Sequence, residues 1–376
     1  MPVKIAVLKE SAESELRVAA TPETIKKYVA KGYSVTVAEG AGLAAAYRDA
    51  DYTAAGAQMA SSNDKAASDA DIILCVQTPS LPLKAKTGAL LVGLLSPHNA
   101  GDKLKSLAAQ GLTALAMELV PRTTRAQAMD VLSSQSNLAG YKAVLEAAAY
   151  FPRAFPMMMT AAGTVPPARV FVMGAGVAGL QAIATARRLG AIVSATDVRP
   201  AAKEQVQSLG ASFVMVESDE TKQAETAGGY AKEMSDDFKQ KQAKLVAETL
   251  VKQDIVITTA LIPGRPAPRL ITEEMVSLMK AGSVILDMAV EHGGNCALSR
   301  PGEIVEVNGV KIVGIRNLPS RIATDSSALY ARNLLNLLGI LIDKDGQIAL
   351  NLEDDILKAI TLTKDGQIIH PNFQPV

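Results

Sequence analysis

A glycine-rich segment, GAGVAG at residues 174–179, constrains the fold of this chain more than any other feature. It directly follows the mostly apolar run 169–173 and leads into an Ala-rich stretch with helical spacing. A strand, a tight glycine turn and a helix in this order open a doubly wound α/β unit that binds a dinucleotide. The first glycine permits the turn, the second lets a pyrophosphate approach the backbone, and the third lets helix and strand pack closely. The alternative is an ordinary tight turn between a strand and a helix.

Asp197 ends the next predicted strand, about 20 residues after the glycines, where dinucleotide-binding domains place an acidic residue. Its carboxylate can accept hydrogen bonds from the adenosine ribose of NAD, and it would repel the 2′-phosphate of NADP. Two alternatives remain: an Asp at a strand end also forms turns, and Arg199 is placed to bind a 2′-phosphate. The pattern favours NAD over NADP.

Short β-branched runs alternate with helical stretches along the chain, and a length of 376 residues favours two domains. We expect an α/β protein with two Rossmann-like, doubly wound parallel-sheet domains separated by a cleft. The N-terminal domain comprises residues 1–138 and is completed by 321–376, whose helix over 328–342 is rich in Leu and Asn. The Rossmann NAD(H)-binding domain comprises residues 139–320. Strands are predicted at 3–7, 34–37, 71–76, 89–95, 112–117, 169–173, 192–196, 211–216, 254–259, 283–287 and 311–314. An Ala-rich helix over 137–147 is long enough to cross between the domains.

Composition and motif content exclude several classes of function. Lys plus Arg and Asp plus Glu both number 38, so no overall basic field attracts nucleic acid. Cys75 and Cys296 stand apart, and the three histidines, His98, His292 and His370, are scattered, so we expect no metal site. The N-terminus lacks a secretory apolar region. The most apolar stretches fall far below the roughly 18 to 20 residues that cross a bilayer, so we expect no direct membrane span.

Several long segments resemble one family of proteins. They cover residues 121–130, 132–141, 160–168, 228–234, 258–264 and 293–296, and the match extends over nearly the whole chain. These segments resemble domain I, the NAD(H)-binding component in the alpha subunit, of proton-translocating NAD(P) transhydrogenases. The wider alanine dehydrogenase/PNT superfamily also contains alanine dehydrogenases and saccharopine-type enzymes. A soluble, NAD-dependent amino-acid dehydrogenase therefore remains the alternative.

The resemblance implies which residues line the nicotinamide end of the NAD(H) site. They are Arg122, Gln127, Asp130 and Ser133, and we take them as the catalytic set. If this stretch is helical, Gln127, Asp130 and either Ser133 or Ser134 share one face, since they lie three or four positions apart. Gln127 would then hold the nicotinamide carboxamide. The alternative is that these polar side chains only cap the start of a helix and otherwise lie on its solvent-exposed face.

The remaining NAD(H) contacts are predicted from the glycine turn together with the resemblance. They are Gly174, Gly176, Val177, Ala178, Gly179, Asp197, Val198, Arg199, Tyr230, Thr259, Ala260 and Leu261. Tyr230 stands in a polar stretch, about 217–237, that matches a mobile loop closing over the nucleotide in transhydrogenases; a plain surface loop is the alternative. If the loop is a lid, Tyr230→Ala weakens nucleotide binding, whereas a charge change at Asp237 does little.

Alanine dehydrogenases and transhydrogenases differ in the chemistry that their sites must perform. An alanine dehydrogenase removes a hydride and a proton, so it needs an acid or base and a cation for the substrate carboxylate. Transfer between two nicotinamides moves only a hydride, for which proximity and orientation suffice. Alanine dehydrogenases have a Lys near the position of Gln77 in this sequence and a His near the position of Ser96. Both side chains are missing here. Arg17, however, matches the family's N-terminal arginine. His98 is either a replacement base or an exposed loop histidine.

The resemblance therefore implies direct hydride transfer from NADH to NADP⁺, with NADP(H) held by a partner chain, the domain III or beta subunit. Membrane subunits would couple this transfer to proton translocation. The resemblance also implies a homodimer, located in the cytoplasm and peripheral on the inner face of the cell membrane. A free-standing amino-acid dehydrogenase and a nucleotide-sensing module without chemistry are the alternatives.

Overall fold

The computed structural model describes residues 2–216, 235–262 and 264–374, and the chain divides into two compact units. Unit 1 comprises residues 1–135 and 319–376, and unit 2 comprises residues 136–318. We expected boundaries after residues 138 and 320; the units divide after residues 135 and 318. Among the described residues, no helix is long and apolar enough to cross a membrane.

Unit 1 contains a six-stranded sheet in the order β3-β2-β1-β4-β5-β6, and every neighbouring pair is parallel. Its strands are β1 (Lys4–Val7), β2 (Ser34–Ala38), β3 (Gln58–Ala60), β4 (Ile72–Gln77), β5 (Leu90–Leu94) and β6 (Thr113–Ala116). Five of these match predicted strands, and the short edge strand β3 was not expected. The order 3-2-1-4-5-6 is that of doubly wound dinucleotide-binding folds.

The helices of unit 1 come from both ends of the chain. They are α1 (Pro22–Ala30), α2 (Asp49–Ala54), α3 (Asn63–Ala67), α4 (Gly101–Ala109), α10 (Ala323–Leu341) and α11 (Asp355–Ile360). Thr21 caps α1 by accepting a hydrogen bond from the backbone of Thr24, and Pro22 occupies the first helical position. Helix α10 buries Tyr330 and Leu334 in the same core as the sheet, because its apolar residues recur at helical spacing. A small antiparallel pair, β16 (Thr363–Lys364) and β17 (Gln367–Ile368), follows α11.

Unit 2 contains a seven-stranded sheet in the order β11-β10-β9-β12-β13-β15-β14. Its strands are β9 (Arg169–Met173), β10 (Ile192–Thr196), β11 (Ser212–Phe213), β12 (Ile255–Thr258), β13 (Val284–Asp287), β14 (Ile304–Val307) and β15 (Val310–Val313). Only β14, which was not predicted, pairs antiparallel. The first six strands repeat the 3-2-1-4-5-6 order of unit 1, which is the Rossmann arrangement.

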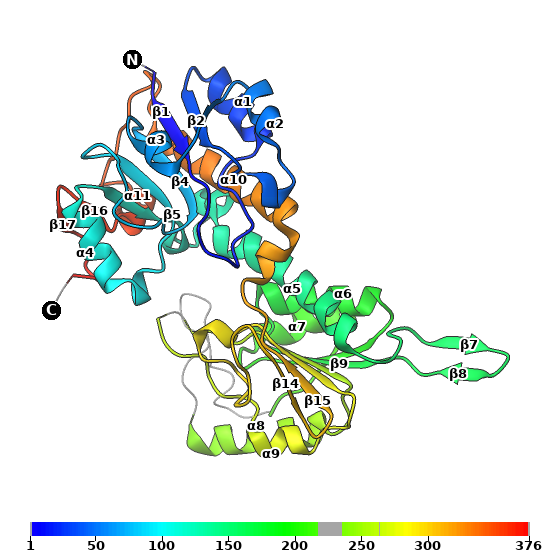
Figure 1. Cartoon of the computed structure of the whole chain (residues 1–376). Helices are drawn as coiled ribbons and strands as arrows, with labels where there is room; N and C mark the ends of the chain where they lie inside the picture. Colours follow the sequence, from blue (N-terminus) through cyan, green and yellow to red (C-terminus); the bar gives the residue numbers. More distant parts are fainter. Residues whose placement is uncertain (1, 217–234, 263, 375–376) are drawn as a thin grey trace. The chain divides into compact units, whose positions relative to one another are not determined.

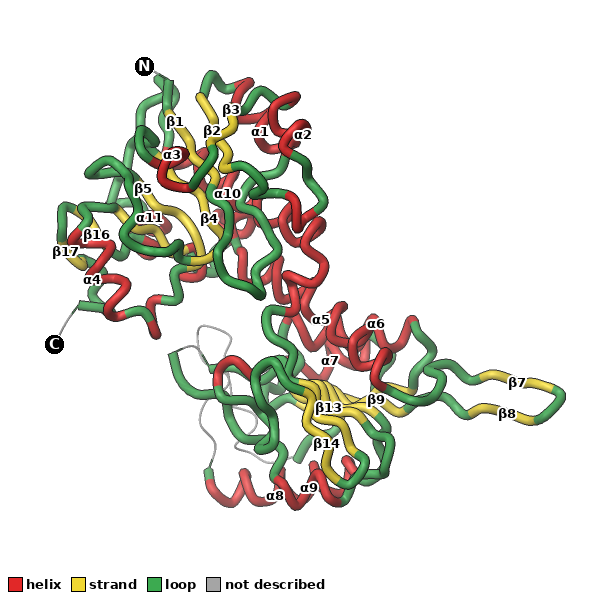
Figure 2. Tube along the Cα trace, viewed as in Figure 1, coloured by secondary structure: helices red, strands yellow, loops and turns green. Residues whose placement is uncertain are grey.

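Both faces of the unit 2 sheet are covered by helices. The helices are α5 (Val131–Tyr150, the first residues of which belong to unit 1), α6 (Val177–Arg188), α7 (Ala201–Ser208), α8 (Asp236–Leu250) and α9 (Glu273–Ser277). In β9, Val170 and Val172 pack in one cluster with α5, α6 and α7, whereas Phe171 and Met173 pack in another with α8 and α9. Successive side chains of a strand point to opposite faces, so this apolar strand is buried on both. Figure 2 shows the two helical layers on either side of the strands.

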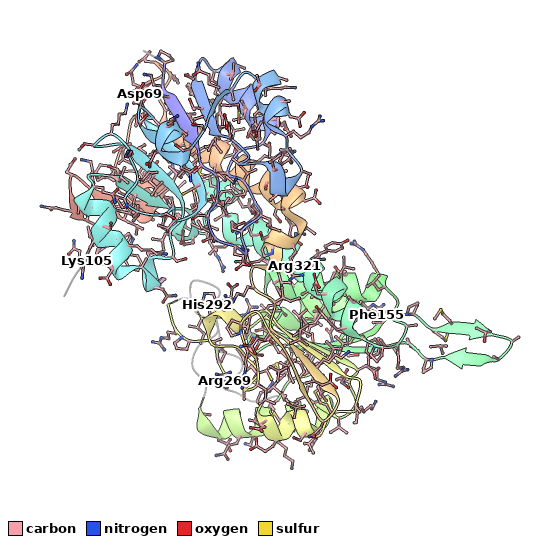
Figure 3. The ribbon with its side chains drawn as sticks, viewed as in Figure 1. Asp69, Lys105, Phe155, Arg269, His292 and Arg321 are labelled. Atoms are coloured by element: carbon pink, nitrogen blue, oxygen red, sulfur yellow. The ribbon has the colours of Figure 1, made fainter. Side chains whose placement is uncertain are left out.

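A β-hairpin that the sequence did not predict interrupts unit 2 between α5 and β9. Its strands, β7 (Met158–Thr160) and β8 (Gly163–Val165), pair only with each other, and Figure 1 shows them extending away from the sheet of unit 2. Phe155, labelled in Figure 3, packs edge-on against Phe151 just before the hairpin begins. Three consecutive methionines at the hairpin, residues 157–159, are 59%, 42% and 77% exposed.

Candidate dinucleotide-binding site

The carboxyl ends of β9 and β12 lie side by side at the centre of the unit 2 sheet, where the strand order reverses. In open α/β sheets this switch point is where ligands bind. The predicted glycine turn follows β9, and Thr259 follows β12. The Thr259 amide donates to the carbonyl of Met173 (2.8 Å), and its hydroxyl donates to the carbonyl of Gly174 (3.1 Å). The two predicted segments are therefore joined directly.

Two glycines of the turn are required by its geometry. Gly174 has φ +103°, a backbone conformation that residues with a side chain rarely adopt. A Cβ on Gly179 would lie 1.8 Å from the carbonyl oxygen of Gly174, so helix α6 can approach the strand only with glycine at this position. Gly140, in α5, likewise permits a close approach between helices, since a Cβ at this position would lie 2.1 Å from the carbonyl oxygen of Ala178.

The middle glycine of the turn leaves room for a ligand. Gly176 has an ordinary φ of −75°, and no atom lies within 4 Å of where its Cβ would stand. It is the N-cap of α6, which begins at Val177, and no side chain caps the helix. The first backbone N–H groups of a helix bind anions, and the helix dipole favours negative charge there. The turn therefore fits a pyrophosphate.

Asp197 is nearly buried and bonded within its own turn. Its carboxylate accepts from the backbone N–H groups of Ala175 (2.7 Å) and Arg199 (2.8 Å), and its side chain is 7% exposed. The guanidinium of Arg199 donates to both carboxylate oxygens at 2.9 and 2.8 Å. Asp197 therefore closes its own turn, and Arg199 is bound to it. Val198, between them, is half-buried.

The loop after β12 is held by a residue that the sequence analysis did not single out. The amide of Asn295, which is fully buried, accepts from the backbone N–H of Ala260 and donates to the carbonyls of Ala260 and Pro268. Leu261, next in the loop, is 43% exposed. The available signal was the position of Asn295 directly after two glycines, in the segment 293–296.

A buried carboxylate fixes the chain around Asn295. Asp287, at the end of β13, accepts from the backbone N–H of Cys296 (3.0 Å) and the hydroxyl of Thr258 (3.0 Å). Arg269, labelled in Figure 3, donates to the carbonyl of Cys296 (2.8 Å). His292, labelled in the same view, belongs to a short 3₁₀ helix, Val290–His292, that leads into this loop.

The segment predicted for the nicotinamide end lies in unit 1 and is not one continuous helix. Residues Thr124–Met129 form a 3₁₀ helix, and Asp130 is extended (φ −71°, ψ 90°) before α5 begins at Val131. The expected single helical face is therefore wrong. Asp130 interrupts it because its carboxylate accepts from the backbone N–H (2.9 Å) and the hydroxyl (2.6 Å) of Ser133, which is a helix N-cap interaction. Arg122 and Gln127 are exposed.

A buried ion pair occupies the region of the family's N-terminal arginine. Arg17 binds the carboxylate of Glu15 through two nitrogens (2.7 and 2.5 Å), and both side chains are at most 3% exposed. Arg17 also donates to the amide oxygen of Gln135 (2.8 Å). Gln77 donates to Glu15 (3.2 Å), so it belongs to the same network.

Two buried carboxyls of unit 1 were missed by the sequence analysis. Burial raises the pKa of Glu10 to about 7, and the backbone N–H groups of Val76 and Gln77, which donate to it, offset part of this rise. Burial likewise raises the pKa of Glu118 to about 7, although it accepts from the N–H of Ser96. Among the described residues, the Oε2 atom of Glu118 has no hydrogen-bond partner.

Two further predicted residues, His98 and Tyr230, remain to be placed. His98 is exposed in a 3₁₀ turn, and its ring packs edge-on against Phe373 with centroids 5.0 Å apart. This is the exposed loop histidine of the two alternatives. Tyr230 lies outside the described residues.

Known proteins similar to this chain agree with this architecture. Residues 6–139 match the N-terminal domain, and residues 143–371 the C-terminal domain, of the alanine dehydrogenase/PNT family. An NAD(P) transhydrogenase subunit alpha polypeptide of Rhodospirillum rubrum is 56% identical, over 98% of both chains. A crystal structure of transhydrogenase from Sinorhizobium meliloti is 52% identical, covers 97% of this chain and 100% of its own, and superposes with a TM-score of 0.89. An alanine dehydrogenase of Halomonas elongata is 32% identical over 98% of this chain and 95% of its own. The chain therefore belongs to the alanine dehydrogenase/PNT family, within its NAD(P) transhydrogenase alpha-subunit branch.

Proposed function

We propose that this chain is the NAD(H)-binding subunit of a proton-translocating transhydrogenase, which passes hydride directly between NADH and NADP⁺ bound to a partner chain. The observation that carries the proposal is the open glycine turn at the switch point of the unit 2 sheet. There Gly176 leaves space for a pyrophosphate in front of the uncapped start of α6. The relatives' names support the transhydrogenase assignment.

The described residues take distinct roles in binding. The N–H groups of Val177 and Ala178 would hold the pyrophosphate, and Asp197 would accept hydrogen bonds from the adenosine ribose. Thr259, Ala260 and Leu261 would line the opposite side of the turn. The resemblance adds Arg122, Gln127, Asp130 and Ser133 at the nicotinamide end. Bound NAD(H) supplies the carbon that carries the hydride, and these side chains hold and orient it.

The residues near the family's dehydrogenase positions favour positioning over acid–base work. Gln77 is an amide and Ser96 a hydroxyl, and neither exchanges a proton readily near neutral pH. Glu10 and Glu118 accept hydrogen bonds from backbone N–H groups. Hydride transfer between two nicotinamides needs no proton, so orientation in a fixed site is sufficient for this reaction.

Partner subunits would complete the complex. The relatives are named as alpha subunits, which implies further subunits. We assign NADP(H) to a domain III or beta subunit and proton translocation to a membrane subunit. These partners would hold this chain at the cytoplasmic, inner face of the cell membrane.

We also propose a homodimer, with the β7–β8 hairpin as its contact. The hairpin presents Met157, Met158 and Met159 to solvent, and exposed contiguous apolar side chains commonly mark an interface. Replacing Met159 by Glu should shift the chain from dimer to monomer in sedimentation equilibrium. The matched control, Ile304→Glu, changes an apolar residue of β14 that is 48% exposed and should leave the dimer intact. A wild-type chain that sediments as a monomer would contradict the homodimer.

One experiment separates the candidate functions. The purified chain is mixed with an NADP(H)-binding transhydrogenase component, and oxidation of NADH is followed with an NADP⁺ analogue as acceptor. We expect rapid transfer that requires both components. Activity of the chain alone with NAD⁺ and alanine would instead identify an amino-acid dehydrogenase. Binding of NADH without either activity would leave a nucleotide-sensing module.

A further inference from the structure

Helix α10 carries two asparagines among its leucines: Asn333, which is buried, and Asn336, which is exposed. They lie three positions apart, and residues at this spacing stand next to each other on a helix. Their neighbours Leu334 and Leu337 are buried in the core of unit 1. Asn333 itself is only 7% exposed, and a polar side chain at such a position is costly unless its hydrogen bonds are satisfied.

Both asparagines hold the same backbone carbonyl. The Nδ2 atom of Asn333 donates to the carbonyl oxygen of Ala128 at 2.8 Å, and that of Asn336 donates to the same oxygen at 3.0 Å. Ala128 directly follows Gln127 and stands near the end of the 3₁₀ helix, where carbonyls lack partners within the helix. The Oδ1 atom of Asn333 also accepts from the hydroxyl of Ser134 (2.8 Å), in the first turn of α5.

We propose that Asn333 and Asn336 are positioning residues that set the orientation of Gln127 toward the nicotinamide carboxamide. This inference rests on the proposed function. Two donors converging on one carbonyl fix both the place and the tilt of the peptide between Ala128 and Met129, which begins one residue after Gln127. The bond from Ser134 ties the same asparagine to the helix that Asp130 caps. The segment between Arg122 and Ser133 is thus held by a helix that lies about 200 residues later in the chain.

The anchoring of this segment does not depend on the asparagines alone. Arg125 forms a two-point ion pair with Asp354 at 2.6 and 2.9 Å, and Ala126 and Met129 are buried in the core. Removing the asparagine amides should therefore loosen the orientation of Gln127 without detaching the segment. Displacements of about 1 Å in a reacting geometry can lower a rate by as much as a hundredfold.

The test uses the full chain with Asn333→Ala and Asn336→Ala combined, assayed with the NADP(H)-binding component. We expect kcat for hydride transfer to fall about tenfold, because orientation is lost, while the Kd for NADH changes less than about threefold. Asn336→Ala alone should retain most of kcat, since Asn333 still holds the carbonyl. The matched control is Tyr330→Phe, which removes a buried hydrogen bond from the same helix to the carbonyl of Cys75 (2.8 Å). It should lower the thermal midpoint yet keep kcat.

The possible failures are distinguishable. If the wild-type mixture transfers no hydride, the proposed function falls, and the positioning assignment falls with it. If the wild type transfers hydride and the double variant keeps the same kcat, only the positioning assignment is overturned. An equal loss of kcat in Tyr330→Phe would also overturn it, because helix stability would then account for the effect.

Discussion

Asn295 and Ala260 exchange two hydrogen bonds, with the Ala260 N–H donating to Oδ1 (3.1 Å) and Nδ2 donating to the Ala260 carbonyl (2.9 Å). The side-chain amide thus makes with Ala260, in the loop after β12, the pair of hydrogen bonds that a residue of a neighbouring strand would make. Its second N–H donates to the carbonyl of Pro268 (2.8 Å), which ties a further segment to the same point. The loop beside the glycine turn is therefore held by one side chain.

Replacing Asn295 by Ala should weaken both the fold and NADH binding. The change leaves three backbone groups without a partner, and each buried unpaired group costs about 1–3 kcal/mol. We expect a lower free energy of unfolding in urea and an NADH affinity reduced about tenfold or more, measured by fluorescence titration. Asn372→Ala, at an exposed position of unit 1, is the control and should change neither. Unchanged NADH affinity in the Asn295 variant would show that the loop does not contact the nucleotide.

Replacing Gly176 by Ala tests the open space in the glycine turn. The backbone φ of −75° accepts alanine and no atom obstructs the Cβ, so the variant should fold with wild-type stability. Its NADH affinity should fall at least about tenfold, or 1.4 kcal/mol, because the methyl group occupies the space of the pyrophosphate.

The control for this change is Gly339→Ala, at a helical position that is equally open. It should raise the free energy of unfolding by about 0.5–1 kcal/mol, since alanine favours helix, without affecting NADH. Calorimetric titration of both variants gives the comparison. Tight NADH binding by Gly176→Ala would place the nucleotide elsewhere.

Asp197→Asn should lower the affinity for NADH more than the affinity for NADPH. The change removes the charge that repels a 2′-phosphate and weakens the bonds to Ala175 and Arg199. We expect NADH affinity to fall about tenfold, as hydrogen bonds to charged groups contribute about 1.5–3 kcal/mol, while NADPH affinity falls less. Titrations with both nucleotides measure the ratio. Asp237→Asn, in an exposed pair with Lys241, should leave the ratio unchanged.

The buried carboxyl of Glu118 should make the stability of unit 1 depend on pH. Its pKa is about 7 in the folded chain, because of burial, against an ordinary value of 4.5. Between these values the folded state binds more protons than the unfolded state, so the free energy of unfolding falls as the pH rises through this window. The fall amounts to about 3 kcal/mol at most, at 1.36 kcal/mol per pKa unit.

Glu118→Gln tests this pH dependence. The variant cannot ionise at this position, so its stability should decline less than that of the wild type between pH 5 and pH 8. Urea denaturation at several pH values measures the decline, with Glu204→Gln, at an exposed position of α7, as the control. Parallel curves for wild type and Glu118→Gln would contradict the raised pKa. A residual decline from Glu10 is expected in both proteins.

The sequence predicted the sheets well because the central strands are mostly apolar. The limits of β9 and β10 were predicted without error, and the glycine turn lies where the motif indicated. Strands β3 and β14 were missed because they lie at sheet edges, with exposed or alternating residues that lack a clear apolar run. The β7–β8 hairpin was missed for a related reason, since almost every residue in it is exposed.

The site was predicted less completely than the fold. The run around Gln127 and Asp130 has helical spacing, but a carboxylate three residues before Ser133 serves better as a cap than as a member of a helix. Partners distant in sequence were invisible, as with Asn333 and Ala128 or Asn295 and Ala260. Glu10 and Glu118 look like surface residues in the sequence, because their desolvation arises only in the folded chain.

The discontinuous composition of unit 1 has a consequence for the order of events during translation. Its core includes Tyr330 and Leu334, which leave the ribosome only after all of unit 2. Residues 1–135 therefore emerge with apolar surface that α10 has yet to cover, while the central unit can already close around its own continuous chain. Nascent domains usually mature from the N-terminus onward. Here unit 2 is free to fold first, whereas residues 1–135 can complete their core only after α10 has been synthesised.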